Sequence, residues 1–313
     1  MALSEFALIE RFFSRLGASR ADVALGVGDD CALLAPASGE QLAVSIDTLV
    51  EGVHFLAGTD PAALGHKALA VGLSDLAACG ARPAWATLAL TLPAVDARWL
   101  EGFAEGFGAL AQRHGMALVG GDTTRGPLAV SVQVHGLVPA GSALRRDGAR
   151  PGDRLYVSGS LGDAGLALRQ RLAGKVPDED LARRLDRPDP RVALGLALRG
   201  IASAAIDLSD GLASDLGHLL ARSGVGATVE LEHLPRSAGV AATGDWSLPL
   251  SAGDDYELCF SVPPGRLADL TKSMADLDVT VHAVGRVEAG EGIRWRLPDG
   301  GQLRPDGGWE HFR

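Results

Sequence analysis

Apolar and polar residues recur along the chain at two spacings, which predict alternating strands and helices. In QLAVSIDT, residues 41–48, Leu42, Val44 and Ile46 alternate with small or polar residues. Because successive side chains of a strand point to opposite faces, Ser45 and Asp47 share the face opposite these apolar residues. The pattern therefore places a hydroxyl and a carboxylate together on one strand face.

The next element is a predicted helix that carries an acid on its apolar stripe. Asp60 before Pro61 is typical of an N-cap and a first helical residue, and the helix extends to about Cys79. Helical steps from Leu64 along the apolar stripe reach Asp75. An acid at such a position is expected to be buried and to need a partner.

The same patterns give an outline of the whole chain. They predict helices near 4–16, 96–114 and 264–277, one further helix that begins at Asp189–Pro190 and another that ends near Arg222. They also predict strands at 84–92, 128–138, 227–232 and 279–287. A further strand in MALVGGDTTRG is predicted to end at Gly120, Gly121 and Asp122. The turn-rich RRDGARPGD, residues 145–153, is the best domain boundary. We therefore predict an α/β (α+β) protein with domains at 1–144 and 145–313.

Composition and charge narrow the function classes. The 313 residues are 47% hydrophobic with 41 Gly and a net charge of −10, which fits a well-packed protein and disfavours nucleic acid or an anionic membrane as partner. The three cysteines lie far apart and indicate neither a disulfide framework nor a zinc site. No apolar run approaches the roughly 20 residues that span a bilayer. The N-terminal segment contains Glu5 and Glu10, which a signal peptide would not carry, so we expect a cytoplasmic protein.

Acids gather at element ends and on buried faces. The set comprises Asp29, Asp30, Asp47, Asp75, Asp122, Asp207, Asp210, Asp254 and Asp255. If several converge, each pair about 5 Å apart costs roughly 3 kcal/mol at an effective dielectric near 20, so cations must accompany them. Oxygen ligands of this kind select Mg²⁺, Mn²⁺ or Ca²⁺. The alternative is that each acid is an independent, solvated turn or N-cap residue.

Common nucleotide-binding motifs are missing from the sequence. It contains no GxxxxGK[ST] loop and no HRD or DFG set, which excludes a P-loop and a protein-kinase fold. GSLGDAG, residues 159–165, is not a dinucleotide fingerprint, and its glycines are better explained by close packing of strand and helix. Since only three lysines occur, any bound phosphate must be neutralised by Arg, backbone N–H groups or metal.

Six segments, in order, resemble the successive motifs of the thiamine-monophosphate kinases. They are GVGDDCALL, VSIDTLVEGVHF, KALAVGLSDLAACGARP, LVGGDTTRGP, IDLSDGLASDLGHL and GDDYELCF. The resemblance extends from about Glu5 to Phe312 with few gaps. That family belongs to the superfamily of aminoimidazole ribonucleotide synthetase, selenophosphate synthetase and a hydrogenase maturation factor. Single motifs recur across the superfamily, whereas their combination is specific to the family.

The resemblance implies a fold and a reaction. It implies a homodimer in which the N-terminal sheets pair into a barrel, with ATP and several Mg²⁺ between the two domains of each chain. The implied reaction is direct, in-line transfer of the γ-phosphoryl of ATP to the phosphate of thiamine monophosphate, without a phosphoenzyme. The acceptor is already an anionic oxygen, so no general base is expected. This agrees with phosphoryl transfer by positioning and charge neutralisation.

The resemblance also implies roles for individual residues. The metal ligands would be Asp30, Ser45, the Ile46 carbonyl, Asp47, Asp75, Asp122, Asp207 and Asp210. ATP would contact Gly121, Asp122, Arg146 and Ser209, and thiamine monophosphate would contact His54, Asp254 and Trp309. At 254 the family usually has Glu, one methylene longer than the Asp of this chain, which changes the reach of that carboxylate.

Three alternatives remain open at this point. One is another ATP-using synthetase of the superfamily, although the chain lacks the reactive N-terminal Cys and the Lys beside a glycine loop of selenophosphate synthetase. The second is a metal-dependent phosphohydrolase, which the acids alone would permit. The third is a non-catalytic protein that binds Mg²⁺ and nucleotide.

Overall fold

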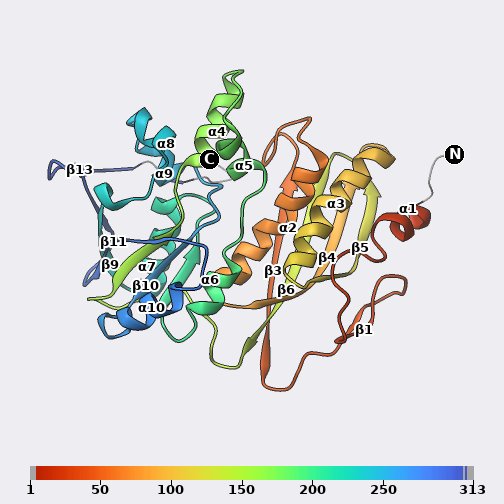
Figure 1. Ribbon diagram of the computed structural model, residues 1–313, viewed down its shortest axis with the longest axis horizontal. Helices are drawn as coiled ribbons and strands as arrows, with labels where there is room; N and C mark the ends of the chain where they lie inside the picture. Colours follow the sequence, from red (N-terminus) through yellow and green to blue (C-terminus); the bar gives the residue numbers. More distant parts are fainter. Residues whose placement is uncertain (1–4, 306, 309–313) are drawn as a thin grey trace. The chain divides into compact units, whose positions relative to one another are not determined.

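The computed structural model describes residues 5–305 and 307–308, and the chain divides into two compact units. The first unit comprises Met1–Leu76 and Ala81–Gly141, and the second comprises Ala77–Gly80 and Ser142–Arg313. Each unit combines helices with a β-sheet (Figure 1). The predicted mixed α/β class is therefore confirmed.

The first unit is built on a four-stranded sheet with the order β3-β6-β4-β5. Its elements are α1 (Glu5–Phe12), β1 (Val23–Leu25), β2 (Leu33–Leu34), β3 (Glu40–Val50), α2 (Pro61–Ala78), β4 (Arg82–Leu92), α3 (Ala97–Arg113), β5 (Ala117–Arg125) and β6 (Ala129–Pro139). The helices α2 and α3 lie side by side over one face of this sheet (Figure 1). The predicted strand at 41–48 and the predicted helix from Pro61 both occur.

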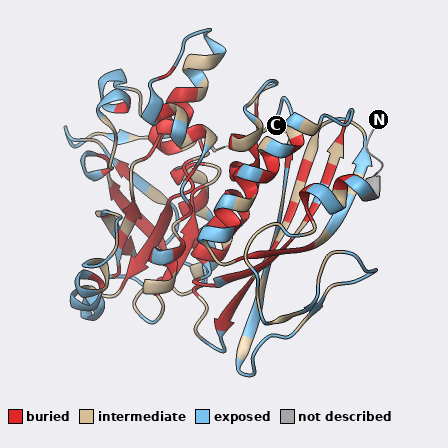
Figure 2. Ribbon diagram, turned by 45° about the vertical axis from the view of Figure 1, so that its right-hand side comes forward, coloured by how far each residue is buried: buried red, intermediate tan, exposed pale blue. Residues whose placement is uncertain are grey.

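Glycines allow α2 and α3 to approach closely. A Cβ on Gly106 of α3 would lie 1.8 Å from the Ala62 carbonyl oxygen of α2, and one on Gly65 of α2 would lie 2.1 Å from the Phe103 carbonyl oxygen. The apolar face of α3, which includes Phe103 and Phe107, is fully buried. Exposed residues alternate with buried ones along α3, whereas nearly all residues of α2 are buried (Figure 2).

The second unit is built on a seven-stranded sheet with the order β13-β12-β9-β11-β7-β10-β8. Its elements are β7 (Arg154–Ser158), α4 (Asp163–Leu172), α5 (Glu179–Asp186), α6 (Val192–Ala197), β8 (Ala204–Asp207), α7 (Leu212–Ser223), β9 (Gly226–Glu230), α8 (Ala238–Thr243), α9 (Ser247–Ser251), β10 (Leu258–Val262), α10 (Leu267–Met274), β11 (Val281–Glu288), β12 (Ile293–Arg296) and β13 (Gln302–Leu303). Leucines of α7 and apolar residues of the central strands form its main core.

Two local predictions were wrong. Gly121 and Asp122 do not end a strand, because β5 continues through them to Arg125 and Asp122 lies beside Ala89 of the parallel strand β4. No helix begins at Asp189–Pro190, since α6 begins only at Val192. Among the described residues, no helix combines the length and apolar character that a membrane crossing needs.

Candidate functional site

In the first unit, Ser45 and Asp47 lie on the face of β3 that α2 covers, as the alternation predicts. The Ser45 hydroxyl donates a hydrogen bond of 2.5 Å to Oδ2 of Asp75, which projects from α2. A Cβ on Gly72, one turn before Asp75, would lie 3.6 Å from Oδ2 of Asp47, which places this carboxylate against α2. The strand and the helix thus bring two acids and a hydroxyl together.

The electrostatics of this acid pair favour a bound cation. Burial, and secondly the charge of Asp75 and a hydrogen bond with its carboxyl group, raise the pKa of Asp47 to about 7. Oδ2 of Asp47 is inaccessible to solvent and lacks a hydrogen-bond partner. A buried acceptor without a donor is costly, and a divalent cation would satisfy it and remove the repulsion between the carboxylates.

Two other predicted ligands of the first unit are exposed. Asp30 lies in the loop before β2, where its backbone N–H donates a 2.8 Å hydrogen bond to Oδ1 of Asp29. Asp122 lies on the edge strand β5. Gly121 beside it has φ 154°, and a Cβ there would lie 1.9 Å from the Leu88 carbonyl oxygen, so only glycine fits.

In the second unit, the stretch IDLSDGLASD forms the end of β8, a short loop and the start of α7. Asp207 is 4% exposed at the end of β8, and the Asp210 N–H donates a 3.1 Å hydrogen bond to Oδ2 of Asp215. Burial, and secondly the charge of Asp210, raise the pKa of Asp215 to about 7, while nearby Arg146 opposes this shift. The fold thus gathers Arg146, Asp210 and Asp215 in one place.

Asp254 belongs to the turn before β10, and this turn is bonded to the same loop. The Asp254 N–H donates a 2.8 Å hydrogen bond to the Ser209 carbonyl oxygen. The Tyr256 hydroxyl donates a 3.0 Å hydrogen bond to Oδ1 of Asp254. Asp254, which is predicted to contact thiamine monophosphate, is therefore hydrogen-bonded to the loop of Ser209, which is predicted to contact ATP.

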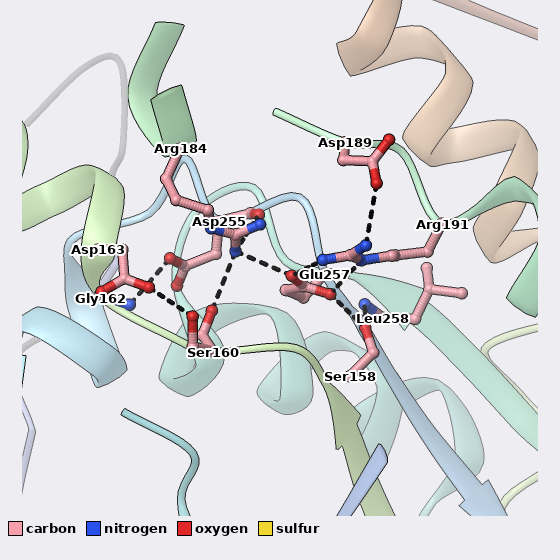
Figure 3. A network of polar contacts seen from close by, with 10 residues as sticks. All are labelled: Ser158, Ser160, Gly162, Asp163, Arg184, Asp189, Arg191, Asp255, Glu257 and Leu258. Atoms are coloured by element: carbon pink, nitrogen blue, oxygen red, sulfur yellow. Dashed lines mark hydrogen bonds and ion pairs between the residues drawn. The ribbon is translucent and has the colours of Figure 1, made fainter. Parts of the chain in front are cut away.

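A network of buried charges lies beneath this turn (Figure 3). Glu257 is fully buried and accepts 2.6 and 2.5 Å hydrogen bonds from Nε and Nη2 of Arg191. Arg184 contacts the same carboxylate at 2.8 Å, and the Ser158 hydroxyl donates to it at 2.5 Å. Two arginines and a hydroxyl satisfy both oxygens, as a buried carboxylate requires.

Comparisons with known proteins identify the family. Residues 28–138 match the family model "AIR synthase related protein, N-terminal domain", and residues 150–297 match "AIR synthase related protein, C-terminal domain". The thiamine-monophosphate kinase of Salmonella typhimurium is 50% identical over 325 residues, covering 100% of this chain and 99% of that protein. The chain belongs to the thiamine-monophosphate kinase family.

Solved structures of this family share the fold. The thiamine-monophosphate kinase of Stenotrophomonas maltophilia has a TM-score of 0.87 and 47% identity, covering 97% of this chain and 99% of that one. A structure described as "AaThiL complexed with AMPPCP and TMP" has a TM-score of 0.78 and 34% identity, covering 88% of this chain and 89% of that one. The resemblance inferred from the six motifs is confirmed.

The remaining residues implied by the family motifs lie in different surroundings. Nδ1 of His54 accepts a 3.0 Å hydrogen bond from the Val50 N–H, and the Ile46 side chain is 64% exposed on the open face of β3. Trp309 lies outside the described residues. Within the described part of the chain, no group of three or more acidic, His or Cys side chains converges as a complete metal cluster. The metal-ligand roles implied for these acids stay predictions.

Several side chains of the second unit hold the loops of the candidate site in place although they were not among the predicted site residues. Asp215 has the character of a turn acid in the sequence, yet it is 3% exposed and holds the Asp210 loop. Tyr256 and Glu257 lie within the GDDYELCF motif. Several acids next to an apolar strand are the sequence feature that could have identified these two residues. Arg184 and Arg191 carried no such signal, because their partner is distant in the sequence.

Proposed function

We propose that this chain transfers the γ-phosphoryl group of ATP to the phosphate of thiamine monophosphate, forming thiamine diphosphate and ADP. The observation that carries the proposal is the acid pair Asp47–Asp75, with its unsatisfied buried oxygen and raised pKa, in a chain of this family. Such a pair favours a bound cation at neutral pH and above, and a kinase acting between two anionic substrates needs one.

The donor set fits Mg²⁺, since every candidate is an oxygen. The residues that would hold it are Asp30, Ser45, the Ile46 carbonyl, Asp47, Asp75, Asp122, Asp207 and Asp210. When bound, Mg²⁺ neutralises the polyphosphate charge that otherwise keeps two anionic substrates apart.

The chain's own residues bind and orient the two substrates. Gly121, Asp122, Arg146 and Ser209 would contact ATP, and Arg146 would neutralise phosphate charge through its guanidinium group. His54, Asp254 and Trp309 would contact thiamine monophosphate. No side chain has to remove a proton, because the attacking phosphate oxygen is already anionic at neutral pH. Catalysis then consists of alignment and charge neutralisation, with direct in-line transfer.

The proposal extends to assembly and domain roles. Leu42, Val44 and Ile46 are 50, 50 and 64% exposed on the edge strand β3, although they are apolar. Such a stripe supports a homodimer formed through this face. We assign ATP binding, Mg²⁺ binding and dimerisation to residues 1–144, and completion of the acceptor site to residues 145–313, in a cytoplasmic enzyme.

The test is a coupled assay for ADP with three acceptor conditions. Thiamine monophosphate, thiamine and no acceptor are compared in Mg²⁺ and again in EDTA. The proposal requires ADP formation with thiamine monophosphate and Mg²⁺ only, with one thiamine diphosphate per ADP and no free phosphate. Equal ADP formation without acceptor would identify a phosphohydrolase, and no ADP in any condition would indicate a binding protein.

A further inference from the structure

The loop that carries Asp29 and Asp30 is the tip of a small hairpin formed by β1 and β2. The two strands contain only 3 and 2 residues and pair in antiparallel fashion. The Ala35 N–H closes the hairpin with a 2.9 Å hydrogen bond to the Asp22 carbonyl oxygen. An isolated two-stranded hairpin is at best marginally stable in water. The position of the loop therefore depends on how the hairpin is attached to the rest of the first unit.

Apolar contacts attach one side of the hairpin to the four-stranded sheet. Val23, Ala32 and Leu34 pack against a buried cluster that includes Trp85 of β4. The side chain of Leu33, by contrast, is 56% exposed. Apolar contact is non-directional, so these few side chains hold the hairpin on the sheet but leave its angle weakly specified.

Polar contacts at Asp22, the residue before β1, specify this angle. Oδ1 and Oδ2 of Asp22 accept hydrogen bonds of 2.8 and 2.5 Å from Nε and Nη2 of Arg20, and Oδ1 also accepts a 3.2 Å hydrogen bond from the Trp85 indole N–H. Nη1 of Arg20 donates a 2.8 Å hydrogen bond to the Gly115 carbonyl oxygen, just before β5. The Arg20 guanidinium group lies 5.6 Å from the centroid of the Trp85 ring. We call Arg20, Asp22 and Trp85 the hairpin clamp.

The hairpin clamp is shielded from solvent and charged at neutral pH. The side chains of Arg20 and Asp22 are 14 and 25% exposed, and Trp85 is 1% exposed. The hydrogen bond from Arg20 lowers the pKa of Asp22, against the opposing effect of burial. A bidentate pair of arginine and carboxylate adds geometric specificity to its strength. The clamp therefore fixes the start of β1 relative to β4 and to the start of β5.

Through the hairpin clamp, the loop of Asp30 is connected to the sheet that holds the acid pair. Trp85 belongs to β4, and Asp47 belongs to β3 of the same four-stranded sheet. At the tip, the Asp30 N–H donates its 2.8 Å hydrogen bond to Oδ1 of Asp29, which is a contact within the loop itself. A binding site needs its groups held to within about 0.5 Å of the productive geometry. Asp30 meets this requirement relative to Asp47 only if the hairpin keeps one position on the sheet.

We propose that Asp22 is a positioning residue, which together with Arg20 and Trp85 fixes the hairpin so that its loop can take part in binding Mg²⁺ and ATP; this rests on the proposed function. The action of Asp22 is indirect, because Arg20 and Trp85 occupy its carboxylate. Without the clamp the hairpin can tilt on its apolar contacts, and binding then has to supply the cost of ordering the loop. This cost falls on Mg²⁺ and nucleotide, and not on thiamine monophosphate.

The experiment compares the full-length wild type with Asp22→Asn, Asp30→Ala and the double variant. Asparagine keeps the shape of the side chain, but it removes the charge and presents an amide group in place of one oxygen that accepts from Arg20. Arg20→Lys is the second test of the clamp and decides the question if Asp22→Asn does not fold. Lysine keeps the positive charge but lacks the planar fork that binds both oxygens of a carboxylate.

Asp186→Asn is the matched control. Asp186 forms the same kind of bidentate pair with Arg171, at 2.6 and 2.5 Å, and the two side chains are similarly shielded, at 23 and 26% exposed. This pair joins α4 and α5 in the second unit, so its loss costs stability without touching the hairpin. Calorimetric titration with the non-hydrolysable analogue AMPPCP in Mg²⁺ gives Kd without turnover. Steady-state kinetics give both KM values, and thermal unfolding gives the melting temperature.

We expect Asp22→Asn to raise the Kd for AMPPCP in Mg²⁺ and the KM for ATP about tenfold, the lower end of the effect of residues that support a metal site. The KM for thiamine monophosphate should stay near the wild-type value. In the Asp30→Ala background, Asp22→Asn should change Kd by less than about twofold, because its effect acts through the loop of Asp30. Asp186→Asn should lower the melting temperature as Asp22→Asn does, while its Kd and both KM values stay near those of the wild type.

Three results would overturn the inference. They are an unchanged Kd of a folded Asp22→Asn or Arg20→Lys variant, an equal rise in Kd for Asp186→Asn, and a full effect of Asp22→Asn that persists in the Asp30→Ala background. If the wild type binds AMPPCP but turns over no thiamine monophosphate, the proposed kinase activity fails, while the titrations still decide the role of Asp22. If the wild type binds no nucleotide, both proposals fail.

Discussion

Asp47→Asn tests the cation site through stability as well as activity. In the absence of metal, burial and the neighbouring Asp75 raise the pKa of Asp47 to about 7 from 3.8. Below pH 3.8 the carboxyl group is protonated in both the folded and the unfolded state. Between these two values the folded protein retains a proton that the unfolded chain releases, so the free energy of unfolding falls as pH rises. Above about pH 7 the Asp47 carboxylate is charged in both states, and the free energy of unfolding is lowered by the full amount that corresponds to the pKa shift.

The magnitude follows from the size of the pKa shift. About three pKa units, at roughly 1.4 kcal/mol each, correspond to about 4 kcal/mol. The side chain retains partial contact with solvent, so screening reduces this to about 2 kcal/mol. Asparagine fills the same space without the charge. Asp47→Asn should therefore be about 2 kcal/mol more stable than the wild type in EDTA at about pH 8, and this gain should disappear near pH 4.

The assay is urea unfolding in EDTA at several pH values, followed by repetition in Mg²⁺ and by the coupled ADP assay. Mg²⁺ should stabilise the wild type more than the variant, because only the wild type retains both carboxylates. Turnover by the variant should fall at least 100-fold. Asp180→Asn is the control, since that aspartate is 89% exposed and should give no gain. A variant that is no more stable than the wild type in EDTA, or that retains near-normal turnover, would refute the reasoning.

Three further predictions concern packing and assembly. Glu257→Gln should lower the free energy of unfolding by about 3–5 kcal/mol, because it leaves two largely buried arginines without their carboxylate. Glu101→Gln, at an exposed ion pair, should change this free energy by less than about 1 kcal/mol in chemical denaturation. Gly106→Ala should destabilise by about 1–3 kcal/mol through overlap with the α2 backbone, whereas Gly217→Ala, which meets no atom within 4 Å, should stabilise α7 by up to about 1 kcal/mol. Ile46→Lys should shift the protein from dimer to monomer in light scattering, and an unchanged mass would contradict the proposed interface.

Strong local patterns predicted most of the elements. The alternation in QLAVSIDT corresponds to β3, and Asp60 accepts hydrogen bonds from the Ala62 and Ala63 N–H groups as the N-cap of α2. The glycines of GSLGDAG allow close packing, although of helix on helix rather than of strand on helix, since a Cβ on Gly165 of α4 would lie 2.3 Å from the side chain of Ala252 at the end of α9. These features depend on residues close in sequence, so a short window contains the necessary information.

Tertiary pairing overrode the local signals where the predictions were wrong. Two consecutive glycines favour a turn at 120–121, yet pairing with β4 keeps β5 extended to Arg125. The polar segment that forms α5 shows few apolar residues, and only Leu181 and Leu185 of that helix are buried. Its helix is stabilised by packing against α4, which a local pattern does not reveal.

The sequence by itself determined the family, because six ordered motifs can be read directly from it. It also indicated which acids are expected to need a cation. Only the tertiary structure decided which acids act on one another. Asp47 pairs with Asp75 because β3 and α2 meet, and Glu257 meets Arg184 and Arg191 because distant segments converge beneath one turn. Charge coupling, burial and backbone strain depend on distances in space, and these distances exist only after the chain has folded.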